Sequence, residues 1–233
     1  MRKGKLYLIP TIISEGTVDK VFSSLWRESI SHIRFFRVEN VRTARRFLSS
    51  LKVFSSIEEL DFMVLDKDSP KESIGGLLKP IYKGHDVGII SESGIPAVAD
   101  PGNWAVTHAH DNNIPIVVLP GPSSIMLALA ASGLNGQQFA FQGYLPIDEK
   151  ECSRMIKSLE NESIAKGQTQ IFIETPYRNN RLLKALLKNL APSTKLCLAM
   201  DLTGSEEKII CKKVAEWSKM ELPKLPAIFL FQG

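Results

Sequence analysis

The sequence predicts an α/β protein built from two α/β domains. Apolar runs alternate with helical patterns over the first half of the chain, which favours a parallel sheet covered by helices. In the second half, strand-like runs follow one another more closely, which favours a mixed sheet. A proline- and glycine-rich segment at residues 120–124 lies between the halves. We therefore predict an N-terminal domain over residues 1–119 with a mostly parallel sheet, and a C-terminal domain over residues 120–233 with a mixed sheet.

In the first half, short apolar runs that stop at polar residues or prolines predict strands, and apolar residues at helical spacing predict helices. The predicted strands are residues 6–9, 34–38, 87–90 and 114–119. The last of these has the near-continuous apolar character of a strand buried on both faces. The predicted helices are residues 18–28 with Thr17 as N-cap, about 41–51, 73–81, 104–110, and 125–132 ending at Gly133. Residues 58–65 mix acidic and apolar side chains, a pattern that favours neither class.

The second half contains five strand-like runs and two helical patterns. The predicted strands are residues 139–144, 170–174, 195–202, 207–212 and 227–231, and the predicted helices are residues 149–165 and 180–190. We find no low-complexity linker and no internal repeat, so we expect the two halves to pack firmly.

Composition excludes several classes of protein. Hydrophobic residues make up 44% of the 233, yet no apolar run is long enough to span a bilayer. The basic N-terminus is followed by a short apolar run that ends at Pro10, which predicts a strand rather than a signal peptide. Three cysteines without CxxC spacing, and scattered histidines, indicate neither a disulfide framework nor a metal site. We expect a cytoplasmic protein, and the net charge of +4 permits nucleic-acid binding without requiring it.

Four loops follow predicted strands of the first half: residues 10–17, 39–42, 91–102 and 120–124. If the strands are parallel, these loops converge on one edge of the sheet, where α/β proteins bind ligands. None matches G-x-G-x-x-G or G-x-x-x-x-G-K-[ST], which argues against a Rossmann or P-loop cofactor. The loops favour a ligand held by backbone groups, apolar walls and a few hydroxyls.

Five segments in order carry a family resemblance: 91–102 (SESGIPAVADPG), 119–124 (LPGPSS), 143–146 (GYLP), 172–178 (FIETPYR) and 201–203 (DLT). They resemble the tetrapyrrole-methylase-like, or class III, S-adenosylmethionine-dependent methyltransferases. The nearest branch methylates a ribose 2′-hydroxyl of small-subunit ribosomal RNA and typically reads SDAGTPxISDPG, PLPGPSA, GFLP, FYESPHR and RELTK. Five motifs in register are far more specific than any one of them.

The resemblance implies a cofactor cleft between the two domains and a homodimer. The S-adenosyl-L-methionine contacts that it implies are Pro10, Ser91, Ser93, Gly94, Ile95, Pro96, Pro120, Ser123, Ser124, Glu174, Thr175 and Pro176. For Ser123 and Ser124, helix N-capping is an equally good explanation. Arg178 keeps its family position and either clamps the substrate or braces Glu174.

The acids nearest the expected cleft are Glu39, Glu92 and Asp100, and we take Glu39 and Glu92 as the candidate catalytic bases. Any one of them is more commonly a surface or loop-bracing acid. Basic residues gather at Arg34, Arg37, Arg42, Arg45, Arg46 and Lys52. Of these, Arg42, Arg45 and Arg46 share one helix face, which either contacts substrate phosphates or is simply solvated.

The chain also departs from the branch that it resembles. The usual ATPIGNLxD reads PTIISEGT here, AEDTRHT reads VENVRTA, and the lysine of RELTK is Gly204. Ribosomal RNA is the favoured acceptor. Two alternatives remain, a methyltransferase of a small molecule such as a tetrapyrrole, and a degenerate member that binds cofactor or RNA without turnover.

Overall fold

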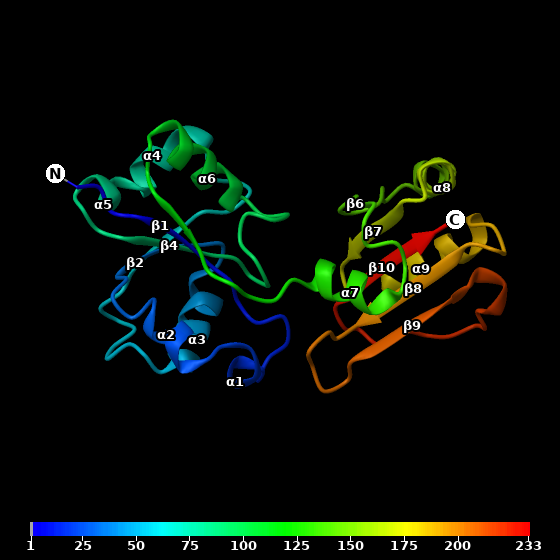
Figure 1. The fold of residues 1–233 in the computed structure, drawn as a ribbon, viewed down its shortest axis with the longest axis horizontal. Coiled ribbons are helices and arrows are strands. Elements are labelled where there is room, and N and C mark those ends of the chain that lie inside the picture. Colours follow the sequence, from blue (N-terminus) through cyan, green and yellow to red (C-terminus); the bar gives the residue numbers. More distant parts are fainter. Residues whose placement is uncertain (1) are drawn as a thin grey trace. The chain divides into compact units, whose positions relative to one another are not determined.

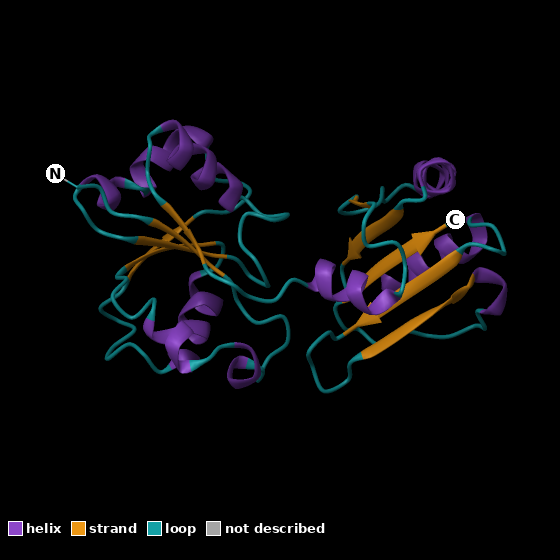
Figure 2. Cartoon of the chain, in the orientation of Figure 1, coloured by secondary structure: helices purple, strands orange, loops and turns teal. Residues whose placement is uncertain are grey.

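The computed structural model describes residues 2–233 and divides into two compact units, Met1–Ser123 and Ser124–Gly233 (Figures 1 and 2). Each unit has its own sheet and its own hydrophobic core. Over residues 2–233, no helix has the length and apolar character needed to cross a bilayer.

The first unit is a parallel sheet covered by helices on both faces. Its strands run in the order β3-β2-β4-β1-β5, and every pairing is parallel. The strands are β1 (Leu6–Ile9), β2 (Phe35–Val38), β3 (Asp61–Val64), β4 (Val87–Ile90) and β5 (Ile116–Val118). One face packs on α1 (Val18–Val21), α2 (Ser24–Glu28) and α3 (Val41–Leu51), and the other on α4 (Ile74–Leu77), α5 (Lys79–Tyr82) and α6 (Gly102–Asp111). This confirms the parallel sheet predicted for the first half.

Gly88 allows the centre of this sheet to pack tightly. It lies in β4 between Tyr7 of β1 and Phe36 of β2. A Cβ atom added at Gly88 would lie 2.6 Å from Ile9 Cδ1 and 3.0 Å from Phe36 Cδ1, closer than packed atoms approach. The missing side chain lets Ile9 and Phe36 pack over the strand, which explains a glycine inside an otherwise apolar run.

The second unit contains a mixed sheet, as predicted, and its strands lie in the order β6-β7-β10-β8-β9. Its strands are β6 (Phe139–Phe141), β7 (Thr169–Glu174), β8 (Lys195–Met200), β9 (Lys208–Lys213) and β10 (Ala227–Gln232). Only the β6–β7 pairing is parallel. One face packs on α8 (Glu149–Lys166) and α9 (Asn179–Asn189), and the other on α7 (Ser124–Ser132).

The helix predicted over residues 18–28 is wrong in detail, because it is two short helices with a break at Phe22. Phe22 adopts an extended conformation (φ −115°, ψ 115°), is buried, and stacks on Trp26 with ring centroids 4.0 Å apart. Ser23 caps α2 through Trp26 N–H, whereas the Thr17 hydroxyl donates to Ser14 O and does not cap. Burying Phe22 requires the break, and local helical spacing does not reveal it.

Two other predicted elements also differ. Residues 71–82 form a 3₁₀ turn (Lys71–Ser73) and two short helices instead of one helix, with the break at Leu78, just before Pro80. β5 is an edge strand paired only with β1, and Val118 is 66% exposed, so burial on both faces is wrong for this strand. The ambiguous run 58–65 contains the opposite edge strand, β3, whose Met63 and Val64 are exposed.

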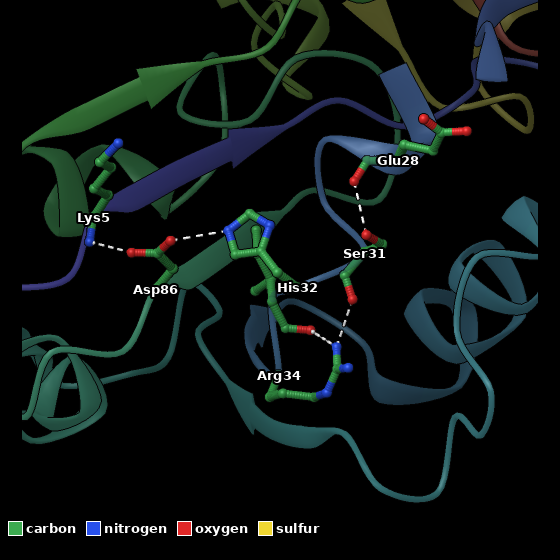
Figure 3. Close-up of polar contacts among 7 residues, drawn as sticks. Lys5, Glu28, Ser31, His32, Arg34 and Asp86 are labelled. Carbon is green, nitrogen blue, oxygen red and sulfur yellow. Dashed lines mark hydrogen bonds and ion pairs between the residues drawn. The ribbon is translucent and has the colours of Figure 1, made fainter. Parts of the chain in front are cut away.

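A carboxylate at the amino end of the parallel sheet ties three segments together (Figure 3). Asp86 accepts a hydrogen bond from Lys5 N–H at 2.7 Å and contacts His32 Nε2 at 2.9 Å. The His32 ring also packs edge-on against Tyr7, with centroids 5.5 Å apart. Arg34 Nη1 donates to Ser31 O at 2.6 Å in the same turn. These contacts fix the starts of β1 and β4 and the turn that leads into β2.

Replacing Asp86 should therefore destabilise the first unit. Asp86→Ala leaves Lys5 N–H and His32 without their acceptor, and we expect a loss of about 1–3 kcal/mol in the free energy of unfolding. Asp86→Asn retains one carbonyl oxygen for Lys5 N–H and should cost less. Urea denaturation measures both variants, and equal costs would show that the Lys5 contact does not carry the stabilisation.

Candidate functional site

The loops that leave the carboxyl edge of the parallel sheet touch one another. Thr11 N–H donates to Gly94 O at 2.9 Å, which joins the loops after β1 and β4. A Cβ atom at Gly121 would lie 2.2 Å from Pro10 Cγ, so the loop after β5 presses directly on the loop after β1. Gly94 has φ +74°, and an added Cβ would lie 3.2 Å from Pro122 O. The predicted convergence of these loops is confirmed within the first unit.

Asp100 and Ser91 hold the shape of the long loop after β4. Asp100 accepts hydrogen bonds from Ala97 N–H at 2.9 Å and Gly102 N–H at 2.7 Å, and the Ser91 hydroxyl donates to Gly94 O at 3.2 Å. Ala97 (φ 67°) and Ala99 (φ 62°) lie in the left-handed region, which costs about 1–2 kcal/mol per residue with a side chain. The Asp100 contacts offset this strain, so Asp100 is a loop-bracing acid.

Glu39 and Glu92, the two candidate bases, lie side by side. Glu39 follows β2, and its Oε1 accepts a hydrogen bond from Glu92 N–H at 3.1 Å. The Glu92 carboxylate in turn accepts from Thr43 Oγ1 at 2.6 Å, in the first turn of α3. The helix begins there because Asn40 caps it through Arg42 N–H at 2.9 Å. The structure therefore places two carboxylates and a threonine hydroxyl in one connected group.

The surroundings of Glu39 favour its neutral form more than water does. Burial raises the pKa of the Glu39 carboxyl; the hydrogen bond from Glu92 N–H opposes this, and the charges of nearby carboxylates, Asp100 first, raise it further. Burial also raises the pKa of Asp100, against hydrogen bonds from Gly102 and Ala97. A carboxyl group with a raised pKa is a stronger base than an ordinary one when it is ionised.

A pocket of about 420 Å³ opens beside this group. Its walls come from the loop after β1, from α1 and α3, and from the start of the loop after β4. Glu92, Thr43 and Arg46 contribute polar groups, and Ile12 and Phe47 contribute apolar walls. This volume lies in the range of small-molecule and cofactor sites.

Thr11 supplies a polar atom in the pocket wall that has no partner of its own. Its side chain is buried, and its Oγ1 makes no hydrogen bond with the described residues. Buried hydroxyls are almost always paired, so this one fits a ligand that supplies the partner. Sequence reasoning missed Thr11 and Thr43; their positions next to Pro10 and one turn into the helix after Glu39 were the available signals.

Sequence reasoning also missed Trp26. Its indole Nε1–H donates to Pro120 O at 2.9 Å, so α2 holds the start of the loop after β5. No motif signalled this role, because it depends on α2 and the loop meeting across 94 residues of chain.

The arginine face predicted on α3 is present, but it is smaller than the basic cluster in the sequence. Arg42, Arg45 and Arg46 are exposed, and Arg46 Nη1 pairs with Glu15 at 3.2 Å. Arg37 is instead buried, where Nε donates to Leu77 O at 2.6 Å and Nη1 to Asp61 at 2.7 Å. Arg34 donates to Ser31 O at the opposite end of the sheet. Arg37 and Arg34 therefore do not belong to this face, because strand pleating and direction separate them from α3.

In the second unit, Glu174 and Arg178 form a partly buried ion pair at the end of β7. Glu174 Oε1 accepts from Arg178 Nη2 at 2.7 Å, from Arg178 Nε at 2.9 Å and from Thr175 N–H at 2.6 Å. The Glu174 side chain is 6% exposed. This geometry shows that Arg178 contacts Glu174, while a substrate contact of Arg178 stays a prediction. Pro176 follows in the same turn, and Ser124 begins α7.

The remaining predicted cofactor contacts of the first unit lie on the meeting loops. Ser91, Gly94 and Pro96 are buried in the loop after β4, Ser93 is exposed, and Ile95 is half-buried. Pro10 is buried against Gly121, while Pro120 is exposed and Ser123 half-buried just before α7. The first unit thus presents glycine- and proline-shaped backbone at one edge, as a ligand held by backbone groups requires.

The comparisons with known proteins agree on one family. The chain is 26% identical over 219 residues to a protein named ribosomal RNA small subunit methyltransferase I from Buchnera aphidicola subsp. Acyrthosiphon pisum (strain APS), covering 93% of this chain and 73% of the relative. It is 28% identical over 211 residues to a protein of the same name from Vibrio cholerae serotype O1, covering 91% and 69%.

The fold and the family profile agree with these relatives. A crystal structure of the methyltransferase CobJ superposes with a TM-score of 0.63 at 17% identity, covering 97% of this chain and 93% of that one. The profile of the family described as Tetrapyrrole (Corrin/Porphyrin) Methylases matches residues 15–217. The chain therefore belongs to the tetrapyrrole methylase family.

Proposed function

We propose that this protein transfers a methyl group from S-adenosyl-L-methionine to a ribose 2′-hydroxyl of small-subunit ribosomal RNA. The observation that carries the proposal is the linked group of Glu39, Glu92 and Thr43, of which Glu92 and Thr43 line a pocket of about 420 Å³ together with Arg46. The names of the relatives support RNA as the acceptor. A cytoplasmic, homodimeric protein is part of the same proposal and rests on the family resemblance.

The residues proposed for the cofactor fit a molecule with an adenosine and an amino-acid end. Gly94 and Gly121 bring the backbone of the meeting loops close together at positions that favour glycine. The other proposed cofactor contacts in the first unit are Pro10, Ser91, Ser93, Ile95, Pro96, Pro120 and Ser123. Those proposed in the second unit are Ser124, Glu174, Thr175 and Pro176. When bound, S-adenosyl-L-methionine supplies an electrophilic methyl group on a positively charged sulfur.

The chain's own residues position the acceptor and take its proton. We place the acceptor nucleotide in the pocket, where Thr11 Oγ1 and the Glu92 carboxylate offer hydrogen bonds to a ribose. Glu39 is the proposed general base that would take the 2′-hydroxyl proton, because burial raises its pKa. Arg46, with Arg42 and Arg45 beyond it, binds flanking phosphates. Arg178 acts indirectly, by holding Glu174.

One alternative keeps the cofactor and replaces RNA with a small molecule such as a tetrapyrrole. The family description and the low polarity of the pocket's Ile12 and Phe47 walls favour it. The exposed arginine face on α3 favours RNA, because a small acceptor in a pocket needs no row of cations outside it. A member that binds without turnover is the other alternative.

Methyl transfer is tested by incubating the purified protein with labelled-methyl S-adenosyl-L-methionine and small ribosomal subunits from a strain that lacks this methyltransferase. We expect label in the ribosomal RNA and resistance of the labelled nucleotide's 3′-phosphodiester bond to alkali, because a 2′-O-methyl group removes the internal nucleophile. Incorporation of label into a tetrapyrrole but not into RNA would show that the acceptor is the small molecule. Cofactor binding without incorporation into either acceptor would favour the non-catalytic alternative.

Glu39→Gln should separate activity from stability. Loss of the base should lower kcat/KM by about 100-fold or more and remove the acid limb of the pH–rate profile, on which activity falls as Glu39 becomes protonated. Because the folded-state pKa of Glu39 is raised, its contribution to stability is full below the unfolded-state pKa and is lost as the pH rises through the folded-state value. The variant should therefore melt at a higher temperature than wild type at pH 7. At about pH 3.5, where Glu39 is already neutral in wild type, the two melting temperatures should be equal. A smaller activity loss than that of Glu92→Gln would reassign the base.

The arginine face is tested by changing Arg42, Arg45 and Arg46 together to Gln. Each phosphate contact contributes to the salt dependence of binding, so we expect weaker RNA binding and a flatter plot of log affinity against log salt. Filter binding over a range of KCl concentrations measures the slope. Lys20, Lys67 and Lys83 are matched control positions elsewhere on the first unit, and a triple Gln variant there should leave the slope unchanged. If both triple variants behave alike, the face does not contact phosphates.

A further inference from the structure

We propose that a pocket on the second unit binds single-stranded RNA, with phosphates on the cations of α9 and a base on Tyr177. The inference rests on the proposed RNA acceptor and adds a binding site for it. The pocket, called here the α9 pocket, has a volume of about 490 Å³. It is bordered by α8, α9 and the segment at residues 145–149.

Cations outnumber acids around the α9 pocket. Its lining contains Arg178, Arg181, Lys184 and Lys188 against the carboxylates of Glu149 and Glu174. The Glu174 carboxylate is paired with the Arg178 guanidinium, so the charges of these two residues cancel. The excess positive charge therefore lies on the three remaining cations of α9.

These three cations are available to a ligand. Arg181, Lys184 and Lys188 lie at i, i+3 and i+7, on one face of α9, and span about 10 Å along the helix axis. Lys188 reaches Glu149 only at 3.5 Å, with both side chains more than 70% exposed, so water screens this pair and little is lost when it breaks. Lys184 has no ion-pair partner within residues 2–233. Arg181 Nη2 donates to Ile147 O, which holds its guanidinium at the rim of the pocket.

An exposed aromatic ring lies at the same pocket. Tyr177 lines it and is 82% exposed, and the neighbouring Ile147 is 65% exposed. Lys224 Nζ lies 5.7 Å from the Tyr177 ring centroid and adds a further cation. An aromatic ring kept in water beside a row of cations is the arrangement that single-stranded nucleic acids require, because bases stack on the ring while phosphates meet the cations.

Single-stranded RNA fits these features better than an acidic peptide does. A peptide carboxylate would satisfy the cations but would leave the ring of Tyr177 without a flat partner. A paired RNA helix would satisfy the cations as well, but its bases are stacked internally and cannot reach Tyr177. The combination therefore selects an unpaired, flexible strand.

The test measures binding of a fluorescently labelled, unstructured oligoribonucleotide to the full chain by anisotropy, at several salt concentrations. The variants are the triple change Arg181→Gln, Lys184→Gln, Lys188→Gln, and the single changes Tyr177→Ala and Tyr177→Phe. The matched control changes Lys157, Lys195 and Lys208 to Gln, three exposed lysines of the same unit that do not line the pocket. Thermal melting confirms that each variant is folded.

We expect the α9 triple variant to bind at least tenfold more weakly and to lower the magnitude of the salt slope by about 2, since each phosphate contact on a single strand contributes about 0.7. Tyr177→Ala should lose about tenfold in affinity, and Tyr177→Phe, which keeps the ring, should bind as wild type does. Equal behaviour of the α9 and control triple variants would overturn the proposal. So would displacement of the RNA by polyglutamate as effectively as by unlabelled RNA.

Methylation assays on ribosomal subunits separate this proposal from the proposed function. If wild type methylates ribosomal RNA while the α9 triple variant keeps wild-type affinity and KM, the pocket is wrong and the function stands. If oligoribonucleotide binding depends on α9 and Tyr177 but wild type transfers no methyl group to RNA, the pocket stands and the function is wrong.

Discussion

The close approach of backbone at Gly94 and Gly121 is the constraint on which the first unit's site depends. Parallel strands place the ends of β1, β4 and β5 at one edge, but parallel pairing alone only brings the loops near one another. Direct contact of Pro10 with Gly121 requires a position without a Cβ atom, and Gly94 beside Pro122 has a positive φ of +74° that favours glycine. The loops therefore form a continuous backbone surface, and the strain at Ala97 and Ala99 is the cost of its shape.

Charge at this edge follows from the same packing. Because the loop after β4 folds back over the end of β2, the Glu92 amide reaches the Glu39 carboxylate and partly shields it from water. Burial then raises the pKa of Glu39. Asp100, in the loop after β4, instead accepts hydrogen bonds from Ala97 N–H and Gly102 N–H. Three acids that are equivalent in the sequence thus acquire three different roles: a half-buried acid, a pocket wall and a loop brace.

The second unit shows how one ion pair can determine which charges are left for a ligand. Glu174 neutralises Arg178 inside the turn after β7, and the neighbouring Tyr177 side chain points into solvent. The cations farther along α9 have no comparable buried partner, so the excess positive charge around the α9 pocket lies on that helix. The arginine within the family motif is therefore paired inside the unit, whereas Arg181, Lys184 and Lys188, outside the motif, line the pocket without a buried partner.

The sequence by itself determined the α/β class, the parallel and mixed sheets, and the loops that carry the family motifs. Apolar periodicity and glycine and proline positions are local, and they decide these features through backbone preference and burial. Only the tertiary structure decided the break at Phe22, the edge position of β5, the burial of Arg37 and the roles of Thr11, Thr43 and Trp26. Each of these features depends on which distant segment packs beside the residue. The contact of Trp26 with Pro120 is an example, because residue spacing along the chain does not predict it.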